Sequence, residues 1–142
     1  MTRVEFYFNV ADKLTKVTEL CHRAVTKGRQ RMVYTQDAAM TELLQQKLWQ
    51  YAPDSFLPSA DPLEESSQFA PIIVDAAGEH LIQDDILINL KAEHPAFFSR
   101  FRYLVELVGN EEADKAAARL RYKFYRDRGY QVKSTDAAAA MM

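Results

Sequence analysis

Positive charge is concentrated in one segment near the C-terminus. Against a single acid, Asp127, the segment 115–128 contains six basic residues: Lys115, Arg119, Arg121, Lys123, Arg126 and Arg128. In a helix, five of the residues in this region would lie on one side, within roughly a 100° arc: Lys115, Arg119, Tyr122, Lys123 and Arg126. We call these five residues the basic ridge. Arginine binds carboxylates through paired hydrogen bonds and a tyrosine ring adds apolar surface, so the ridge predicts a site for an acidic peptide.

The alternative for the basic ridge is an ordinary solvated helix face. Such faces commonly mix charges of both signs, whereas the residues from 115 to 126 include no acid. The whole chain has a formal charge of −2 at pH 7, so it has no general attraction to DNA or anionic membranes. The opposite side of the same helix is apolar, and we expect it to face the sheet through Ala113, Ala117, Leu120 and Phe124.

Trp49 and Phe56 form a second candidate binding surface. In a helix over 37–51, Trp49 lies about 180° around the axis from Met40, so it points away from the main apolar side. Phe56 follows in the proline-bounded loop 53–58. An exposed tryptophan near loop aromatics is typical of a protein interface. Alternatively, the loop folds back and covers Trp49 within the monomer.

The first predicted turn lacks the features of a nucleotide site. Phosphate-binding turns need closely spaced glycines at a helix N-terminus. The turn from Phe8 to Asp12 has no glycine, and the carboxylate of Asp12 would repel a phosphate. The glycines of the chain are also spaced too widely for either phosphate-binding pattern; they are Gly28, Gly78, Gly109 and Gly129. We therefore expect no nucleotide-binding loop and no cofactor.

Other reactive side chains do not combine into a catalytic or metal site. Cys21 and His22 are neighbours, but adjacent helical residues point about 100° apart, so we expect Cys21 to be a buried structural thiol. His80 and His94 lack metal-ligand spacing with this cysteine. A single cysteine, with no leader-like start and no apolar run of membrane length, indicates a cytoplasmic protein.

Strand-like and helix-like segments alternate along the chain. The predicted strands are 4–9, 32–34, 72–75, 86–90, 103–108 and 131–134. The predicted helices are 12–27, 37–51 and 111–128, with a short one at 94–100. This order predicts a single-domain α/β fold, Rossmann-like but without the nucleotide-binding loop, with a mostly parallel sheet flanked by helices on both faces. The domain would cover 1–135, and the alanine- and methionine-rich tail 136–142 would be disordered.

Four segments of the chain together resemble the chi subunit of bacterial DNA polymerase III. They are VEFYFN (4–9), LWQYAPDSFLP (48–58), DILINL (85–90) and ARLRYKFYRDRGY (118–130). The last is the most specific, because its arginine, tyrosine, lysine and glycine spacings match together. The likeness extends from Val4 to about Thr135.

The resemblance implies an adaptor without a catalytic site of its own, within a DNA-directed DNA polymerase complex. Chi subunits bridge the psi subunit of the clamp loader to the acidic C-terminal tail of single-stranded-DNA-binding protein, so contact with DNA would be mainly indirect. The implied tail-binding residues are Lys115, Arg119, Tyr122 and Lys123, with Val108 as apolar lining. The implied psi contacts are Trp49 and Phe56, for which a repair helicase would compete. The alternatives are a small nucleotide-binding α/β enzyme and a direct single-stranded nucleic-acid binder.

Overall fold

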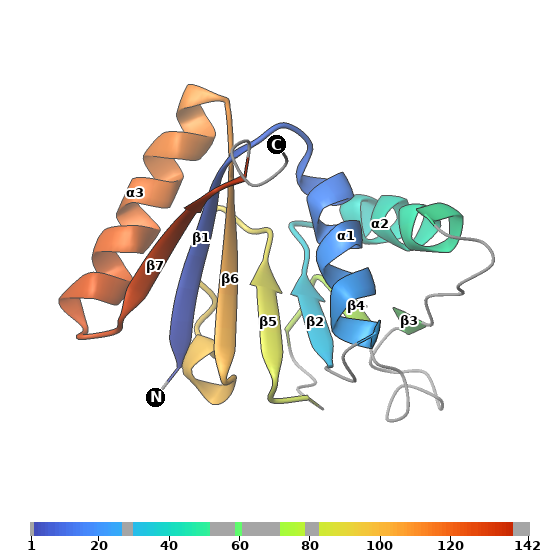
Figure 1. The fold of residues 1–142 in the computed structure, drawn as a ribbon, viewed down its shortest axis with the longest axis horizontal. Helices are drawn as coiled ribbons and strands as arrows, with labels where there is room; N and C mark the ends of the chain where they lie inside the picture. Colours follow the sequence, from blue (N-terminus) through green and yellow to red (C-terminus); the bar gives the residue numbers. More distant parts are fainter. Residues whose placement is uncertain (1, 27–29, 52–58, 61–71, 79–82, 138–142) are drawn as a thin grey trace.

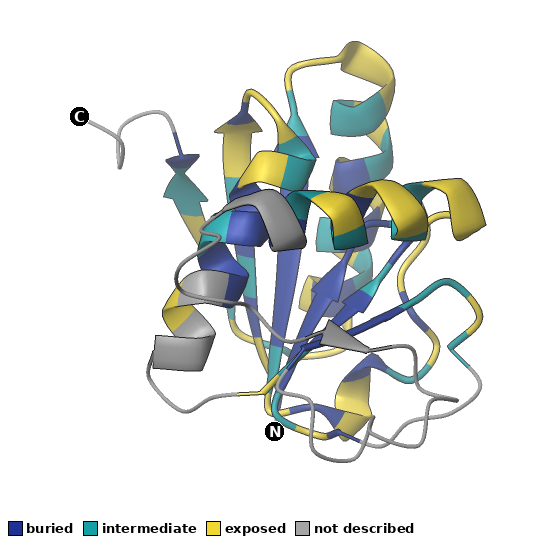
Figure 2. Ribbon diagram, turned by 90° about the vertical axis from the view of Figure 1, so that its right-hand side faces the viewer, coloured by how far each residue is buried: buried dark blue, intermediate teal, exposed yellow. Residues whose placement is uncertain are grey.

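The computed structural model describes residues 2–26, 30–51, 59–60, 72–78 and 83–137. These residues form a seven-stranded sheet in the order β3-β4-β2-β5-β6-β1-β7, and every neighbouring pair is parallel (Figure 1). The predicted α/β class with a mostly parallel sheet is therefore confirmed. Figure 2 shows the central strands buried between helices whose outer sides are exposed.

The elements follow the predicted order closely. The strands are β1 (Arg3–Val10), β2 (Arg31–Tyr34), β3 (Ser59–Ala60), β4 (Ile72–Asp75), β5 (Ile86–Asn89), β6 (Tyr103–Gly109) and β7 (Val132–Asp136). The α-helices are α1 (Lys13–Thr26), α2 (Ala38–Tyr51) and α3 (Glu112–Asp127). Only the two-residue strand β3 was not predicted, since it lies in the proline-rich connection after α2.

Two boundaries differ from the sequence-based predictions. Instead of a helix over 94–100, the chain forms only the 3-10 helix η2 (Phe98–Arg100), because its bonds join residues three apart, as from the Phe101 N–H to the Phe98 carbonyl. The predicted tail also begins too early. Asp136 pairs with Phe8 in the sheet, and Ala137 is buried. Residues 138–142 lie outside the described part of the chain.

Two hydrophobic cores lie on opposite faces of the sheet. Side chains that alternate along the strands supply both of them. On one face α1 and α2 pack through residues such as Val17, Cys21 and Leu48. On the other face α3 and η2 pack through residues such as Tyr125 and Phe98. Helices thus cover both faces, as predicted.

The buried position of Cys21 agrees with a structural thiol. Its side chain has no exposed surface and belongs to the core beneath α1 and α2. Burial raises the pKa of the Cys21 thiol to about 12, which keeps it protonated and unreactive at neutral pH.

Helix α3 faces the sheet with a different side from the predicted one. Its buried residues are Ala118, Arg121 and Tyr125, whereas Leu120 is 72% exposed. The prediction that Ala113, Ala117, Leu120 and Phe124 face the sheet is therefore wrong for Ala113 and Leu120, which are exposed. Ala117 is partly buried, and Phe124, also partly buried, packs against the core on this face. A buried polar contact explains this rotation of α3. The sheet beneath α3 contains the buried carboxylate of Glu106, and both Arg121 and Tyr125 bind it. A hydrophobic pattern gives no signal for such an anchor.

Candidate functional site

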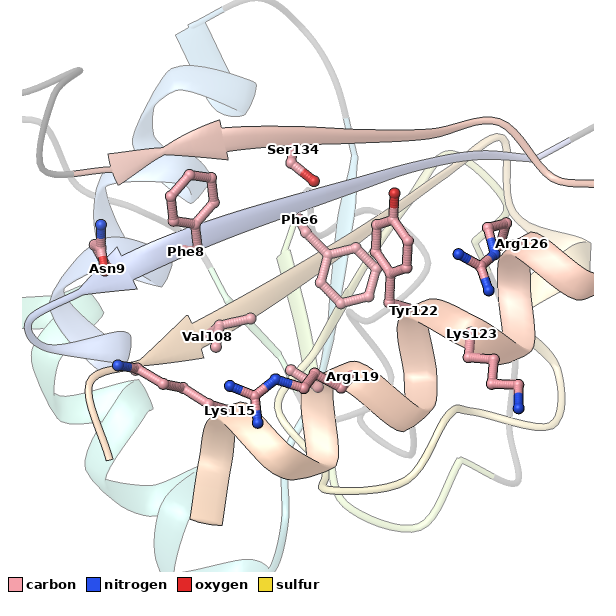
Figure 3. A pocket seen from close by; sticks show the side chains of 12 residues that line it. Phe6, Phe8, Asn9, Val108, Lys115, Arg119, Tyr122, Lys123, Arg126 and Ser134 are labelled. Carbon is pink, nitrogen blue, oxygen red and sulfur yellow. The ribbon is translucent and has the colours of Figure 1, made fainter. Parts of the chain in front are cut away.

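A groove of about 380 Å³ lies between α3 and the adjacent strands (Figure 3). Helix α3 provides one wall, with Lys115, Ala118, Arg119, Tyr122, Lys123 and Arg126. Strands β1, β6 and β7 provide the other wall and the floor, with Phe6, Phe8, Asn9, Val108, Gly109 and Ser134. The groove thus includes the whole basic ridge, and it also includes Val108, which was predicted as apolar lining.

The two walls of the groove differ in chemistry. Every charged group lining it comes from α3, and the strand wall is apolar or neutral. Lys115 lies 3.8 Å from the exposed Glu112, a surface pair that contributes little. Arg119 and Lys123 have no ion pair within the described part of the chain. The groove therefore presents unneutralised positive charge along one side of an apolar floor.

The floor of the groove is ordered by ring packing. The Tyr122 ring lies 5.5 Å from the Phe6 ring at an angle of 59°, a tilted arrangement that aromatic pairs favour. Phe6 is buried and Tyr122 half-buried, so part of the tyrosine ring remains open to the groove. Val108 lies nearby on β6 (Figure 3).

A buried polar cluster fixes the rotation of α3 above this floor. The carboxylate of Glu106 on β6 accepts hydrogen bonds from Arg121 Nε at 3.1 Å and from the Tyr125 hydroxyl at 2.5 Å. The Asn89 amide donates to both Glu106 oxygens, at 3.0 and 3.1 Å. Arg121 Nη1 also donates to the Ala92 carbonyl at 2.8 Å. Burial raises the pKa of Glu106 to about 7, although Arg121 and the other donors oppose this shift.

Because of this cluster, Arg121 does not contribute to the positive surface that the sequence indicated. Arg121 is 3% exposed, and its guanidinium is paired with Glu106 rather than directed to solvent. The positive charge of the groove therefore comes from the four cations of the basic ridge. Sequence spacing had placed Arg121 outside the ridge, which agrees with its buried position.

Two free N–H groups in the first turn of α1 donate hydrogen bonds to a carboxylate of the protein itself. One oxygen of Asp12 accepts hydrogen bonds from the Leu14 N–H at 3.1 Å and the Thr15 N–H at 3.3 Å. The hydrogen bond from Thr15 holds the pKa of Asp12 below its usual value. In a Rossmann-like fold these N–H groups would bind a phosphate. Here a carboxylate of the protein takes that role.

A second carboxylate lies beside the same turn. Asp114 of α3 binds Lys13 Nζ at 2.7 Å through one oxygen and the Gly109 N–H at 2.6 Å through the other. The ammonium group of Lys13, the first residue of α1, is therefore neutralised. These contacts also tie the start of α3 to the end of β6.

The second predicted surface is only partly described. Trp49 belongs to α2, but its side chain lies outside the described residues, and Phe56 lies outside them altogether. His80 and the His22 side chain are outside them as well. His94 stacks on Phe124 with ring centroids 3.6 Å apart, and burial lowers its pKa. Nothing in the described structure tests Trp49 and Phe56 as a binding surface.

The described residues contain neither a metal-ligand cluster nor a membrane-spanning helix. Within the ranges that the structure describes, no three His, Cys, Asp or Glu residues are grouped so that they could hold a metal ion. None of the described helices is long and apolar enough to cross a membrane.

Apart from Val108 of β6, the prediction from sequence missed the strand side of the groove. Phe6 and Phe8 are two residues apart in β1, and this spacing puts both on one face of a strand. That signal was available in the sequence. The Glu106 cluster, by contrast, joins residues from β5, β6 and α3 that only the fold brings together.

The described residues define a small parallel α/β protein with a cationic groove over an apolar floor. The sequence model of the family described as DNA polymerase III chi subunit, HolC, matches residues 1–133. The chain belongs to this family.

Three relatives named DNA polymerase III subunit chi agree with this assignment. The protein from Pseudomonas aeruginosa is 33% identical over 140 residues, which cover 94% of this chain and 95% of the relative. The proteins from Haemophilus influenzae and Escherichia coli are each 28% identical, over 92% and 94% of this chain and 94% and 97% of their own lengths. The resemblance inferred from the four sequence segments is thereby confirmed.

Proposed function

We propose that this chain is a cytoplasmic adaptor of the replication machinery that binds the acidic C-terminal tail of single-stranded-DNA-binding protein in the groove. The observation that carries this proposal is the pairing of a cationic wall with an apolar floor on a chain of net charge −2. The psi subunit of the clamp loader would bind at the surface around Trp49 and Phe56, where a repair helicase would compete.

The groove suits an acidic peptide in two complementary ways. Arg119 can hold a carboxylate through two parallel hydrogen bonds, and Lys115 and Lys123 add positive charge at either side along α3. Tyr122 and Val108 offer apolar surface to a hydrophobic side chain of the same peptide. Exposed charges make such binding sensitive to salt.

The adaptor role does not require a tight contact with each tail. A single strand of DNA coated with the binding protein displays many tails close together. Once one tail is bound, its neighbours are present at high effective concentration, which raises the overall affinity without any new contact. Contact with DNA itself would then be mainly indirect.

Calorimetric titration with an acidic peptide ending in phenylalanine tests the proposal. We expect saturable binding that weakens with salt, and Arg119→Ala should cost about 1–3 kcal/mol of binding free energy as a lost charge-assisted contact. Arg128→Ala is the matched control, because it removes the same charge at the end of α3 from a residue that does not line the groove. Equal affinity of the Arg119→Ala variant and the unmodified chain would refute the site.

Two other functions are tested by separate binding measurements. A nucleotide-binding enzyme is disfavoured because Asp12 uses the N–H groups of α1 and Asp114 neutralises Lys13; a rise in Tm with ATP or NAD would support it nonetheless. The cations along the groove would also suit a phosphate backbone. Affinity for bare single-stranded DNA at physiological salt, with none for the peptide, would favour a direct nucleic-acid binder.

A further inference from the structure

One side of α3, away from the groove, presents apolar residues to solvent. This apolar stripe consists of Ala113, Ala116, Ala117, Leu120 and Phe124, which recur at three- and four-residue steps along the helix. Leu120 is 72% exposed, more than any other large hydrophobic residue that the structure describes, and Ala113 and Ala116 are exposed as well. A row of exposed apolar side chains on one helix is typical of a protein contact surface.

The C-terminal end of the apolar stripe is held in place by neighbouring rings and charges. The Phe124 ring stacks on His94 with centroids 3.6 Å apart, and the Arg128 guanidinium carbon lies 4.3 Å from the centre of the same ring. Phe124 also meets Phe98 of the core edge-on at 6.0 Å. Because these contacts already fix the ring, a partner that packs on the stripe would lose little side-chain entropy there.

The apolar stripe is complementary to itself when two copies of α3 run in opposite directions. Ala117 and Leu120 are equally far from one point in the helix, and Ala113 and Phe124 are equally far from the same point. In an antiparallel pair about that point, Leu120 would face Ala117 of the second copy, and Phe124 would face Ala113. Each large side chain thus meets an alanine, and small residues let two helix axes approach closely.

The charges beside the apolar stripe fit the same arrangement. Glu112 and Lys123 lie on one flank of the stripe, eleven residues or about three turns apart. Both are exposed, and the side chain of Glu112 is 83% exposed, with only a surface contact of 3.8 Å to Lys115. In a twofold antiparallel pair the same flanks meet, so Glu112 of each copy would lie beside Lys123 of the other. Opposite charges therefore meet at both ends of the stripe.

We propose that the apolar stripe is a self-association surface, through which two copies of this chain pack their α3 helices antiparallel. Figure 1 shows α3 at the end of the molecule opposite α1 and α2, where a second copy can approach it. The contact is small, since α3 has 16 residues and is about 24 Å long. We therefore expect a reversible dimer with a dissociation constant on the order of 100 μM. Both basic ridges would lie on the same side of this dimer.

Sedimentation equilibrium of the full chain between about 10 μM and 1 mM tests the proposal. The average mass should rise with concentration from 16.3 kDa toward twice that value. Leu120→Glu should raise the dissociation constant roughly tenfold or more, because its carboxylate would be buried against Ala117 of the second copy without a partner. Leu43→Glu is the matched control, since it makes the same change at an exposed leucine of α2 and should leave association unchanged.

A charge exchange tests the direction of the two helices. Glu112→Lys and Lys123→Glu should each weaken association roughly fivefold, because each places like charges together. The two substitutions combined should restore it, since the pairs form again with their signs exchanged. Thermal unfolding of every variant checks that the fold is kept.

Three results would overturn this inference. A mass that stays at 16.3 kDa up to about 1 mM would exclude self-association. A dimer that Leu120→Glu leaves intact, or that Leu43→Glu weakens equally, would use another surface. Failure of the combined charge variant to recover would exclude the antiparallel arrangement. No peptide is present in these measurements, so their outcome is independent of what the groove binds.

Discussion

Glu106 is the residue on which the geometry of the groove depends. Its carboxylate is fully buried, yet it binds Arg121, Tyr125 and Asn89 from three directions. Such a carboxylate is costly to bury when charged and is stable only if every oxygen is satisfied. Because Arg121 and Tyr125 lie one turn apart on α3, the same contacts direct Arg119 and Tyr122 toward the groove.

The raised pKa of Glu106 predicts how stability depends on pH. Its folded-state pKa is about 7 against an ordinary value of 4.5, with burial as the main cause. Between these values the folded state binds more protons than the unfolded state. The contribution of Glu106 to the free energy of unfolding is therefore full below about pH 4.5 and is lost as the pH rises through about 7. Urea unfolding at pH 5, 6, 7 and 8 should show this decline.

Variants at this position separate the contribution of Glu106 from that of other groups. Glu106→Gln should flatten the decline in the free energy of unfolding between pH 5 and 8. Asp127→Asn, which changes an exposed residue at the end of α3, should leave that decline in place. If Glu106→Gln is too unstable, Glu106→Gln combined with Arg121→Met removes both buried charges. A decline of unchanged slope in both Glu106 variants would assign the pH dependence to other residues.

At the scale of elements, α3 is held by polar contacts on its buried side. Arg121→Met and Arg126→Met remove the same charge from one helix. The first leaves Glu106 buried without its cation and should cost about 3–5 kcal/mol of unfolding free energy at pH 8. The second should change stability little, since Arg126 is exposed. Urea unfolding of both variants measures the difference, and equal costs would mean that the ion pair does not hold α3.

Periodicity predicted the elements well but not how two of them face their neighbours. Strand and helix segments such as 4–9 and 111–128 were found because apolar residues recur with periods of two and 3.6. The rotation of α3 was missed because Arg121 faces the core, and a charged residue is normally assigned to the surface. Strand β1 has a bulge at Asn9, where its register with β6 shifts. This bulge was missed because its conformation depends on pairing with β6 and β7, which no local pattern contains.

The candidate site could be predicted from the sequence only in part. The basic ridge lies on one exposed side of one helix, so helical spacing alone brings its residues together. Val108 was placed beside the ridge by the family resemblance, and it lines the groove. The opposite wall comes from β1 and β7, which are more than a hundred residues apart in sequence. Their meeting depends on the order of strands in the sheet, which composition and spacing do not determine.

At the scale of the whole molecule, the surfaces proposed for psi and for the tail peptide are associated with opposite faces of the sheet. The groove lies beside α3, whereas α2, which contains Trp49, packs on the other face through Leu44 and Leu48. The sheet between them is a rigid, close-packed layer. A bridging protein requires such separation, because both partners must bind at once.

This arrangement predicts that psi and the tail peptide bind independently. Trp49→Ala should abolish or strongly weaken binding of purified psi while leaving the affinity for the acidic peptide within about twofold, and Arg119→Ala should do the reverse, since sites without shared partners behave additively. Titrating the peptide into the chain alone and into its complex with psi should give the same Kd. A Kd raised severalfold by psi would mean that the two partners compete, and a chain that binds them in turn could not bridge them.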